Sequence, residues 1–272
     1  MTWTLSYCTL DRSPMFALPE TLDEQMHAAA AVGFTLVTPD IFSLRAYRDG
    51  HRGSVRSLRE LLDDVGIATF DLSGVTISDD RASSLRELDE FLTFARELDA
   101  DWIQSRLVVD SPTSRAIYTE AAERAADAGV GFAFEYSPFV PVCTLAAAAQ
   151  LVREVAATVP GQAVIVDTWH FARTGDTLDD LRALEPELFG YVQLDDAIAA
   201  GSDMRFDTLN RRALPGEGVL PLVSFLDTCT ALGLEGVLSI EVLNDELRLL
   251  DARTYATRVW DATHALLART KS

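Results

Sequence analysis

The sequence predicts a single (β/α)8 barrel, the TIM-barrel fold, spanning residues 1–272. Short apolar, β-rich segments alternate with amphipathic segments, and the alternation occurs eight times. Eight strand–helix repeats in about 250 residues are what this barrel requires. No linker rich in glycine, serine or proline interrupts the pattern, which favours one domain. A doubly wound sheet is the alternative, but it usually begins with a glycine-rich first turn, and residues 8–12 read CTLDR.

The elements follow in order along the chain. Strands are predicted where β-branched, aromatic and other apolar residues cluster, at 4–9, 35–38, 68–72, 102–108, 131–136, 163–167, 190–194 and 236–242. Helices are predicted where alanine, leucine, arginine and glutamate recur at helical spacing, at 22–32, 54–65, 82–98, 112–128, 145–159, 178–184, 221–232 and 252–269. Several helices end in a glycine just before the next strand, as C-terminal caps do: Gly33, Gly66, Gly129 and Gly233.

Composition bounds the class of protein. Hydrophobic residues make up 48% of the chain, so a large core is available. The 42 acidic residues outnumber the 23 basic ones, and the resulting charge of −19 repels phosphodiester backbones and anionic lipid headgroups. No run approaches the roughly 18 apolar residues of a membrane span, and the first ten residues lack a signal-peptide pattern. We therefore expect a cytoplasmic protein with neither nucleic-acid nor membrane partners.

Cysteine and lysine usage narrows the chemistry. Cys8, Cys143 and Cys229 form no C-x-x-C pair, which indicates neither a disulfide framework nor a thiolate zinc site. The only lysine, Lys271, stands beside the C-terminus. Schiff-base aldolase chemistry, pyridoxal phosphate anchoring and a Walker phosphate loop each need a lysine on the scaffold. These three classes are therefore excluded.

Polar side chains close four successive predicted strands: Glu135, Asp167, Gln193 and Glu241. The active site of such a barrel lies at the carboxyl ends of its strands. Carboxylates gathered there repel one another unless a cation holds them. A ligand set of three carboxylates and an amide oxygen favours Mn²⁺, Mg²⁺ or Co²⁺. The alternative is that single members cap the following helices or pair with arginine.

Several segments carry a resemblance to a known family: FE at 134–135, DTWH at 167–170, VQLDD at 192–196, RALPGEG at 212–218 and IEV at 240–242. They resemble the xylose-isomerase-like barrels, which include sugar-phosphate isomerases and epimerases, inosose dehydratases, 3-dehydroshikimate dehydratases and type IV apurinic endonucleases. The resemblance covers essentially the whole chain and is strongest from Glu135 onward. The DNA-repair branch fits poorly, because its members gather three metals with several histidines and this chain has four histidines in all.

The resemblance implies roles for individual residues. Residues matching Glu135, Asp167 and Glu241 bind the metal in that family, and residues matching His170 and Arg212 contact the substrate. At position 193 the family usually has histidine, whereas this chain has glutamine, as do some branches similar to 3-dehydroshikimate dehydratase. An amide oxygen can coordinate a metal but is a weaker donor than imidazole. This departure favours elimination chemistry.

Other polar residues near the predicted strand ends have two interpretations each. His170 follows Asp167 by three positions at the start of a helix, which directs both side chains into one pocket; a structural imidazole is the alternative. His51 lies in a predicted loop, 48–53, on the same face and is a weaker candidate for substrate contact. Asp195 and Asp196 are either acid–base groups or the start and cap of a loop.

The sequence favours a metal-dependent isomerase or epimerase that enolises a small keto-sugar, keto-cyclitol or related polyol acid. The metal polarises the carbonyl, and Glu135 and Glu241 exchange protons with the substrate. The same proton abstraction followed by β-elimination gives the alternative, a dehydratase of the 3-dehydroshikimate or inosose type. A second alternative, of another class, is a non-catalytic sugar-binding or partner subunit with a structural metal. The sequence leaves open whether the chain forms a homo-oligomer.

Overall fold

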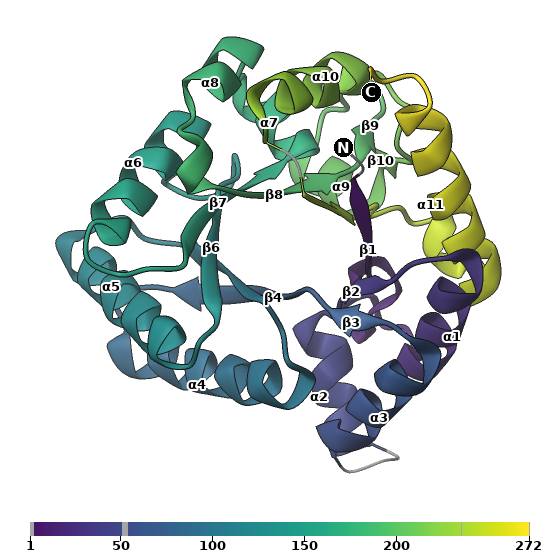
Figure 1. Cartoon of the computed structure of the whole chain (residues 1–272), viewed down its shortest axis with the longest axis horizontal. Coiled ribbons are helices and arrows are strands. Elements are labelled where there is room, and N and C mark those ends of the chain that lie inside the picture. The colour runs from purple at the N-terminus through teal and green to yellow at the C-terminus, as the bar shows by residue number, and fades with distance from the viewer. Residues whose placement is uncertain (1–2, 51–53, 235, 272) are drawn as a thin grey trace.

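The structure is a computed structural model that describes residues 3–50, 54–234 and 236–271. Parallel strands form an inner ring, and the helices surround it (Figure 1). The sheet has nine strands in the order β3-β2-β1-β11-β8-β7-β6-β5-β4. Their bounds are β1 Thr4–Cys8, β2 Leu36–Thr38, β3 Ala68–Thr69, β4 Asp71–Ile77, β5 Trp102–Leu107, β6 Gly131–Glu135, β7 Gln162–Asp167, β8 Phe189–Leu194 and β11 Val237–Ile240. The (β/α)8 prediction is confirmed.

The ninth strand arises because the predicted third strand is interrupted at Phe70. The carbonyl oxygen of Phe70 accepts hydrogen bonds from the N–H groups of both Asp101 and Trp102, each at 3.1 Å. The first half of the predicted strand, β3, therefore pairs with β2, and the second half, β4, pairs with β5. Between β2 and β4 the structure shows one isolated bridge, Asp40 to Ser73. If β3 and β4 are counted as one interrupted strand, the sheet has the eight strands that were predicted.

The eight predicted helices are all present: α1 Leu22–Val32, α3 Val55–Val65, α4 Arg81–Leu98, α5 Pro112–Asp127, α6 Leu145–Ala156, α8 Leu178–Ala183, α10 Leu222–Leu232 and α11 Ala252–Leu267. A helix start at His170 is also confirmed, as α7 Thr168–Thr174. Two further helices follow strand ends, α2 Ile41–Asp49 and α9 Met204–Asn210. The predicted loop at 48–53 is wrong in its first two residues, because α2 continues to Asp49 after Asp40 caps its first turn.

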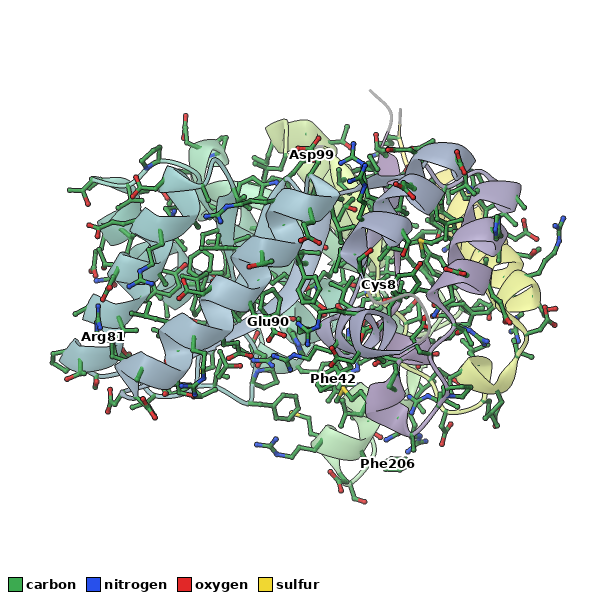
Figure 2. All side chains as sticks on the ribbon, turned by 90° about the horizontal axis from the view of Figure 1, so that it is seen from below. Cys8, Phe42, Arg81, Glu90, Asp99 and Phe206 are labelled. Carbon is green, nitrogen blue, oxygen red and sulfur yellow. The ribbon has the colours of Figure 1, made fainter. Side chains whose placement is uncertain are left out.

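The two ends of the barrel differ in what they expose. Phe42, which follows β2, and Phe206, in α9, lie at the carboxyl end of the strands, and Asp99 lies at the opposite end (Figure 2). Two-residue strands β9 Asp196–Ala197 and β10 Arg212–Ala213 pair antiparallel at the carboxyl end. Within the described residues, no helix combines the length and apolarity needed to cross a membrane.

Inside the barrel, glycine at one position makes room for a large side chain. A Cβ atom on Gly131 of β6 would lie 2.3 Å from the ring of Trp102 on β5, a distance that no real contact allows. The indole therefore fills the barrel at its amino end. Above it, Phe70, Ala133, Ile165 and Tyr191 form a buried cluster. The main core lies between the sheet and the helices.

Candidate metal and substrate site

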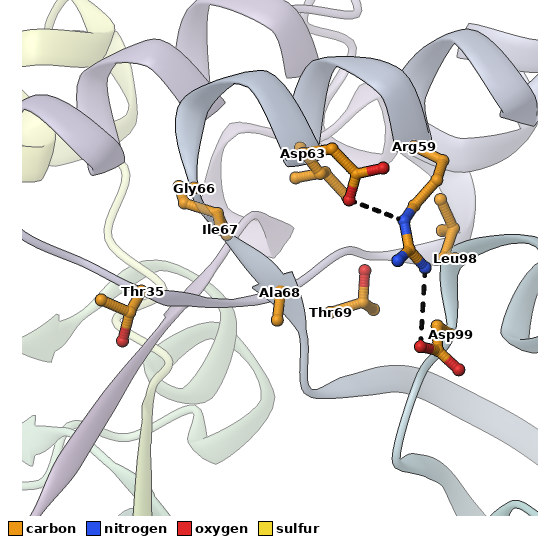
Figure 3. A pocket seen from close by; sticks show the side chains of 10 residues that line it. Thr35, Arg59, Asp63, Gly66, Ile67, Ala68, Thr69, Leu98 and Asp99 are labelled. Atoms are coloured by element: carbon orange, nitrogen blue, oxygen red, sulfur yellow. Dashed lines mark hydrogen bonds and ion pairs between the residues drawn. The ribbon is translucent and has the colours of Figure 1, made fainter.

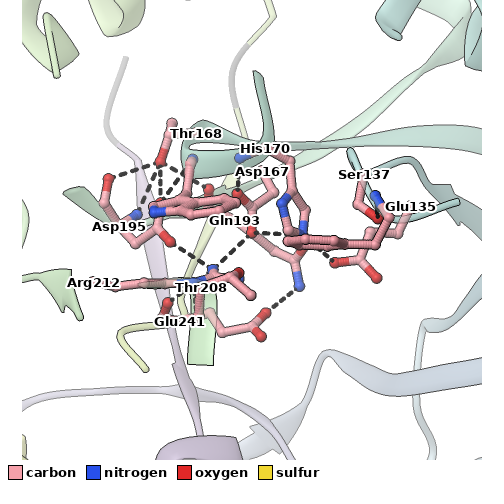
Figure 4. Close-up of polar contacts among 12 residues, drawn as sticks. Glu135, Ser137, Asp167, Thr168, His170, Gln193, Asp195, Thr208, Arg212 and Glu241 are labelled. Atoms are coloured by element: carbon pink, nitrogen blue, oxygen red, sulfur yellow. Dashed lines mark hydrogen bonds and ion pairs between the residues drawn. The ribbon is translucent and has the colours of Figure 1, made fainter. Parts of the chain in front are cut away.

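The barrel brings the predicted site residues to one end. Glu135 closes β6 and Asp167 closes β7. Asp167 is in register with Gln193 of β8, and Gln193 is in register with Ser239 of β11, two positions before Glu241. Figure 4 shows their side chains converging.

Glu135, Asp167 and His170 form the tightest group. Each offers one ligand atom, and these atoms all lie within 4.8 Å of one another. The Nε2 atom of His170 is 3.7 Å from Oε1 of Glu135 and 3.9 Å from Oδ2 of Asp167. The N–H of His170 donates to Oδ1 of Asp167 at 2.7 Å, so Asp167 caps the helix that carries His170. The sequence interpretation missed His170 as a candidate ligand, although this three-residue spacing pointed to it.

Gln193 and Glu241 form a second group. The Nε2 atom of Gln193 donates a hydrogen bond to Oε2 of Glu241 at 2.5 Å. Its Oε1 is buried and has no hydrogen-bond partner among the described residues. A buried amide oxygen without a partner costs free energy, so this atom is a candidate ligand for a cation. The four predicted ligands thus stand as two adjoining groups, with Glu241 outside the three-residue group.

Arg212 links the two groups. Its Nη1 donates to Oδ2 of Asp167 at 2.9 Å, to Oδ2 of Asp195 at 2.5 Å and to the main-chain oxygen of Glu241 at 3.4 Å. Its Nε donates to the carbonyl of Thr208 at 3.0 Å, and the side chain is 3% exposed. Arg212 reaches the cavity, as the predicted substrate contact requires, but two buried aspartates already engage its charge.

Burial shapes the protonation of this cluster. It raises the pKa of Glu135 to about 7, with Arg106 opposing, and the pKa of Glu241 also rises. For Asp167, burial is outweighed by Arg212 and His170, and the pKa falls. Burial lowers the pKa of His170 to about 4. The imidazole is therefore neutral near pH 7, which is the form that binds a metal.

Asp195 and Asp196 hold main chain in place. Asp195 accepts hydrogen bonds from the hydroxyl of Thr168 at 2.7 Å and the N–H of Trp169 at 3.0 Å. Asp196 accepts four main-chain N–H bonds of 2.8 to 3.1 Å, from Ala197, Gly216, Gly218 and Leu220. A Cβ on Gly218 would lie 2.4 Å from Oδ1 of Asp196. Of the two interpretations, this geometry favours loop anchors.

A cavity of about 580 Å³ opens above these residues. Glu135, His170, Arg212 and Glu241 line it, and Asp167 and Gln193 stand behind them. Its apolar lining includes Met15, Phe42, Phe139 and Leu243. The predicted substrate contact of His51 lies outside the described residues.

Three more arginines line this cavity, and the sequence interpretation missed all of them. Arg45 is tied to Glu90 at 2.6 Å. Arg106, on β5, has Nη1 3.9 Å from Oε2 of Glu135, beyond hydrogen-bond range. Arg205, on α9, lies over the ring of Phe139 at 5.0 Å. Neither Arg106 nor Arg205 has a hydrogen bond to the described residues. Inward alternation on β5 could have indicated Arg106, whereas α9 was not predicted at all.

A second cavity, of about 300 Å³, lies at the opposite end of the barrel (Figure 3). Arg59 crosses its rim, 2.9 Å from Asp63 and 3.8 Å from Asp99. None of the predicted site residues line it. In barrels of this kind the amino end of the strands serves stability, and chemistry belongs to the carboxyl end.

The parallel barrel, with acidic residues at the carboxyl ends of its strands, defines a TIM barrel, and the comparison with family models identifies which family it belongs to. Residues 26–267 match the xylose isomerase-like TIM barrel family, and the chain belongs to that family. It is 28% identical over 253 residues to a 3-dehydroshikimate dehydratase of Pseudomonas aeruginosa. This match covers 88% of the chain but 39% of that relative, so the chain spans about two fifths of its length.

Solved structures share the fold. A fusion protein of a xylose isomerase-like TIM barrel and 4-hydroxyphenylpyruvate dioxygenase aligns with a TM-score of 0.86 and 24% identity, over 99% of this chain and 44% of that one. The IolI protein, described with a bound zinc atom, aligns with a TM-score of 0.86 and 18% identity over 99% of both chains.

Proposed function

We propose that this chain is a divalent-metal-dependent dehydratase that removes a proton beside the carbonyl of a small hydroxylated keto acid and then eliminates water. One observation carries the choice of an acid as substrate. Arg106 and Arg205 line the same cavity as Glu135 and Glu241, and neither guanidinium has a hydrogen bond to the described residues. A guanidinium that lines a cavity and makes no hydrogen bond there is suited to a carboxylate ligand.

The choice of dehydration over isomerisation rests on two further supports. The curated relative is named a 3-dehydroshikimate dehydratase, and its named substrate is a hydroxylated cyclic keto acid. Gln193, which replaces the usual family histidine, also favours elimination. The dehydratase, the alternative at the sequence level, therefore becomes the favoured function. We propose 3-dehydroshikimate as the first substrate to test.

The residues present fit a divalent cation. Three candidate ligand atoms lie within 4.8 Å of one another, and the Gln193 amide oxygen is buried without a partner. Glu135, Asp167 and His170 would hold the ion, with Gln193 and Glu241 beside it. The imidazole extends the candidate metals from Mn²⁺, Mg²⁺ and Co²⁺ to Zn²⁺. When bound, the ion supplies stabilisation of negative charge on the carbonyl oxygen.

Glu241 is our candidate for the proton acceptor, because it lines the cavity and stands outside the three-residue group. Its carboxylate takes the proton from the carbon beside the carbonyl, and the electrons of that C–H bond move toward the carbonyl oxygen. As they return, the bond to the hydroxyl group on the next carbon breaks. Glu241 gives its proton to the departing hydroxide, so that one water is released and the enzyme is restored.

An epimerase is the second candidate, and a specific observation favours it. Glu135 and Glu241 both line the cavity. Two carboxyl groups can remove a proton from one face of a substrate and return one to the other face. If the substrate is a neutral sugar, Arg106 and Arg205 have no anionic group to bind in that reaction.

The experiment compares both reactions in one preparation. Protein loaded with Mn²⁺ is incubated with 3-dehydroshikimate, and the aromatic acid that forms on loss of water is followed by its absorbance. In parallel, neutral keto-sugars are incubated in deuterated water and examined by NMR for deuterium beside the carbonyl. Dehydration of the acid supports the proposal. Deuteration of a keto-sugar without any dehydration overturns it in favour of an epimerase, and no reaction in either arm overturns both.

A further inference from the structure

A polar cluster lies inside the barrel beneath the candidate site. Asp71 of β4, Gln104 of β5 and Tyr191 of β8 are all buried. Nε2 of Gln104 donates to Oδ2 of Asp71 at 2.9 Å, and the hydroxyl of Tyr191 donates to the same oxygen. The Tyr191 ring packs edge-on against Phe70, with centroids 4.8 Å apart. The Asp71 carboxylate is therefore held in one place by two donors and a packed ring.

Gln104 connects this cluster to the cavity. The side chain is 2% exposed, yet it lines the cavity that Glu135 and Glu241 also line. Its amide nitrogen faces Asp71, and its amide oxygen has no hydrogen-bond partner among the described residues. Because Gln104 lines the cavity and its amide nitrogen is engaged by Asp71, the amide oxygen is the polar atom of this side chain left to face the cavity. The residue thus offers the cavity one acceptor.

The orientation of this amide follows from Asp71. The oxygen and nitrogen of a glutamine amide exchange places by a half-turn, which would change the atom offered to the cavity from acceptor to donor. A half-turn here would bring the amide oxygen against the Asp71 oxygen that already receives the Tyr191 hydroxyl. Two acceptors in contact repel, so Asp71 fixes the acceptor toward the cavity.

We propose that Gln104 is a specificity-determining residue that accepts a hydrogen bond from a substrate hydroxyl, and that Asp71 is a positioning residue that sets its amide. Gln104 and Arg106 are two positions apart on β5, so both point inward, with Cα atoms roughly 6.6 Å apart. One small ring can reach both of them. The substrate class is then a ring with a carboxylate for Arg106 and a hydroxyl group for Gln104, which deepens the proposed function and rests on it for the carboxylate.

Two probes separate the hydroxyl contact from the carboxylate contact. Calorimetric titration of the Mn²⁺-loaded protein with benzoate measures the carboxylate contact, and titration with 3,4-dihydroxybenzoate adds ring hydroxyls. We expect the dihydroxy acid to bind wild type more tightly than benzoate does, and the ratio of the two affinities is called the hydroxyl advantage. Gln104→Leu should reduce this advantage roughly 3- to 10-fold, the value of one neutral hydrogen bond, with benzoate affinity unchanged. Val108→Ala, which changes an apolar residue of the same cavity, should leave the advantage intact.

A second pair of variants tests the positioning role. Asp71→Leu removes the acceptor beneath Gln104 and should reduce the advantage, whereas Asp71→Asn retains an oxygen there and should restore most of it. Thermal unfolding of each variant checks that it is folded, and Gln104→Met replaces Gln104→Leu if the latter is not. An equal effect of Asp71→Asn and Asp71→Leu overturns the positioning role.

The outcomes distinguish this inference from the proposed function. If wild type binds the dihydroxy acid and Gln104→Leu retains the full advantage, the hydroxyl contact is wrong and the acid-binding function stands. If wild type binds neither aromatic acid, the acid-binding function is wrong. The same variants are then titrated with the neutral keto-polyol D-fructose. A loss of affinity in Gln104→Leu supports the hydroxyl contact by itself, and equal affinity overturns it.

Discussion

Arg212 and Asp167 are 45 positions apart in the chain, and their side chains meet at 2.9 Å in a buried ion pair. The same guanidinium nitrogen reaches Asp195 at 2.5 Å. Arg212 lies on β10, at the start of the loop whose main chain Asp196 anchors. A candidate metal ligand on β7 is therefore held by a loop that follows β8, and the site depends on that loop being in place.

Arg212→Met should destabilise the metal-free protein by about 3–5 kcal/mol, because it leaves Asp167 and Asp195 buried without their cation. Urea unfolding measures the change, and saturating Mn²⁺ should recover part of it by binding the folded state. The matched control is Arg211→Met. Arg211 is 42% exposed, and its buried partner Asp207 keeps the N–H of Gly201 as a donor, so the loss of Arg211 should cost less, about 1 kcal/mol. Equal losses in both variants would show that the buried pair has no special role.

Asp167→Asn, Glu135→Gln and His170→Ala should each weaken Mn²⁺ binding at least ~10-fold, since even residues that only orient metal ligands have effects of this size. Competition with a metal-sensitive dye measures the affinity. Glu87→Gln is the control, because Glu87 lines the same cavity and accepts a hydrogen bond from the N–H of Thr76 instead. A comparable loss in Glu87→Gln would mean that general acidity attracts the ion.

Gln193 is tested by two substitutions, Gln193→His, which keeps a ligand atom at this position, and Gln193→Ala, which removes it and should weaken metal binding. Gln193→His should retain metal binding and shift preference toward Co²⁺ or Zn²⁺, which favour imidazole. It should also slow turnover, because the amide nitrogen that holds Glu241 is replaced. Metal affinity and turnover are measured together. Unchanged metal affinity in Gln193→Ala would show that this residue is not a ligand.

The double variant Arg106→Gln with Arg205→Gln should raise KM for the keto acid roughly 10- to 100-fold with a smaller change in kcat, because it removes charge-assisted hydrogen bonds to the substrate carboxylate. Steady-state kinetics give the split. Arg45→Gln should have a much smaller effect, since Arg45 is engaged by Glu90, which Arg48 also pairs at 2.8 Å. A KM change of the same size in Arg45→Gln would point to the overall positive field of the cavity.

Gly218→Ala should destabilise the protein by more than Gly233→Ala. A Cβ at position 218 would lie 2.4 Å from both the Ala197 carbonyl and the Asp196 carboxylate, and both partners are held in the loop. Gly233 has a positive φ of 70° but open space around it, so alanine there should cost about 1 kcal/mol. Thermal unfolding compares the two variants, and equal shifts would show that the loop accommodates the extra atom.

Much of the fold was predictable from the sequence, because each strand is a short apolar run and each helix has its own periodicity. The placement of Glu135, Asp167 and Glu241 followed from the barrel, since parallel strands end at one edge. The interruption at Phe70 was not predictable. It depends on a carbonyl that accepts two N–H groups from the start of the neighbouring strand β5, and no residue type marks that choice.

Parts of the site depend on tertiary contacts that a linear pattern does not carry. The partnership of Arg212 with Asp195 needs β9 and β10 to pair, and each is only two residues long. Gln104 could be assigned to the inner face of its strand, but its fixed amide depends on Asp71 of β4, which Tyr191 of β8 holds in turn. Arg205 acquires its position from α9, a seven-residue helix too short to leave a periodic signature.

The interrupted third strand gives the barrel wall a seam. Along β2 and β4 a single isolated bridge, Asp40 to Ser73, replaces a continuous ladder. Ser73 and Gly74 also line the cavity, so the seam runs into the mouth of the site. Local opening costs least where main-chain hydrogen bonds are fewest. We therefore expect amide protons beside this seam to exchange with solvent before those of β6 and β7, whose ladder is continuous.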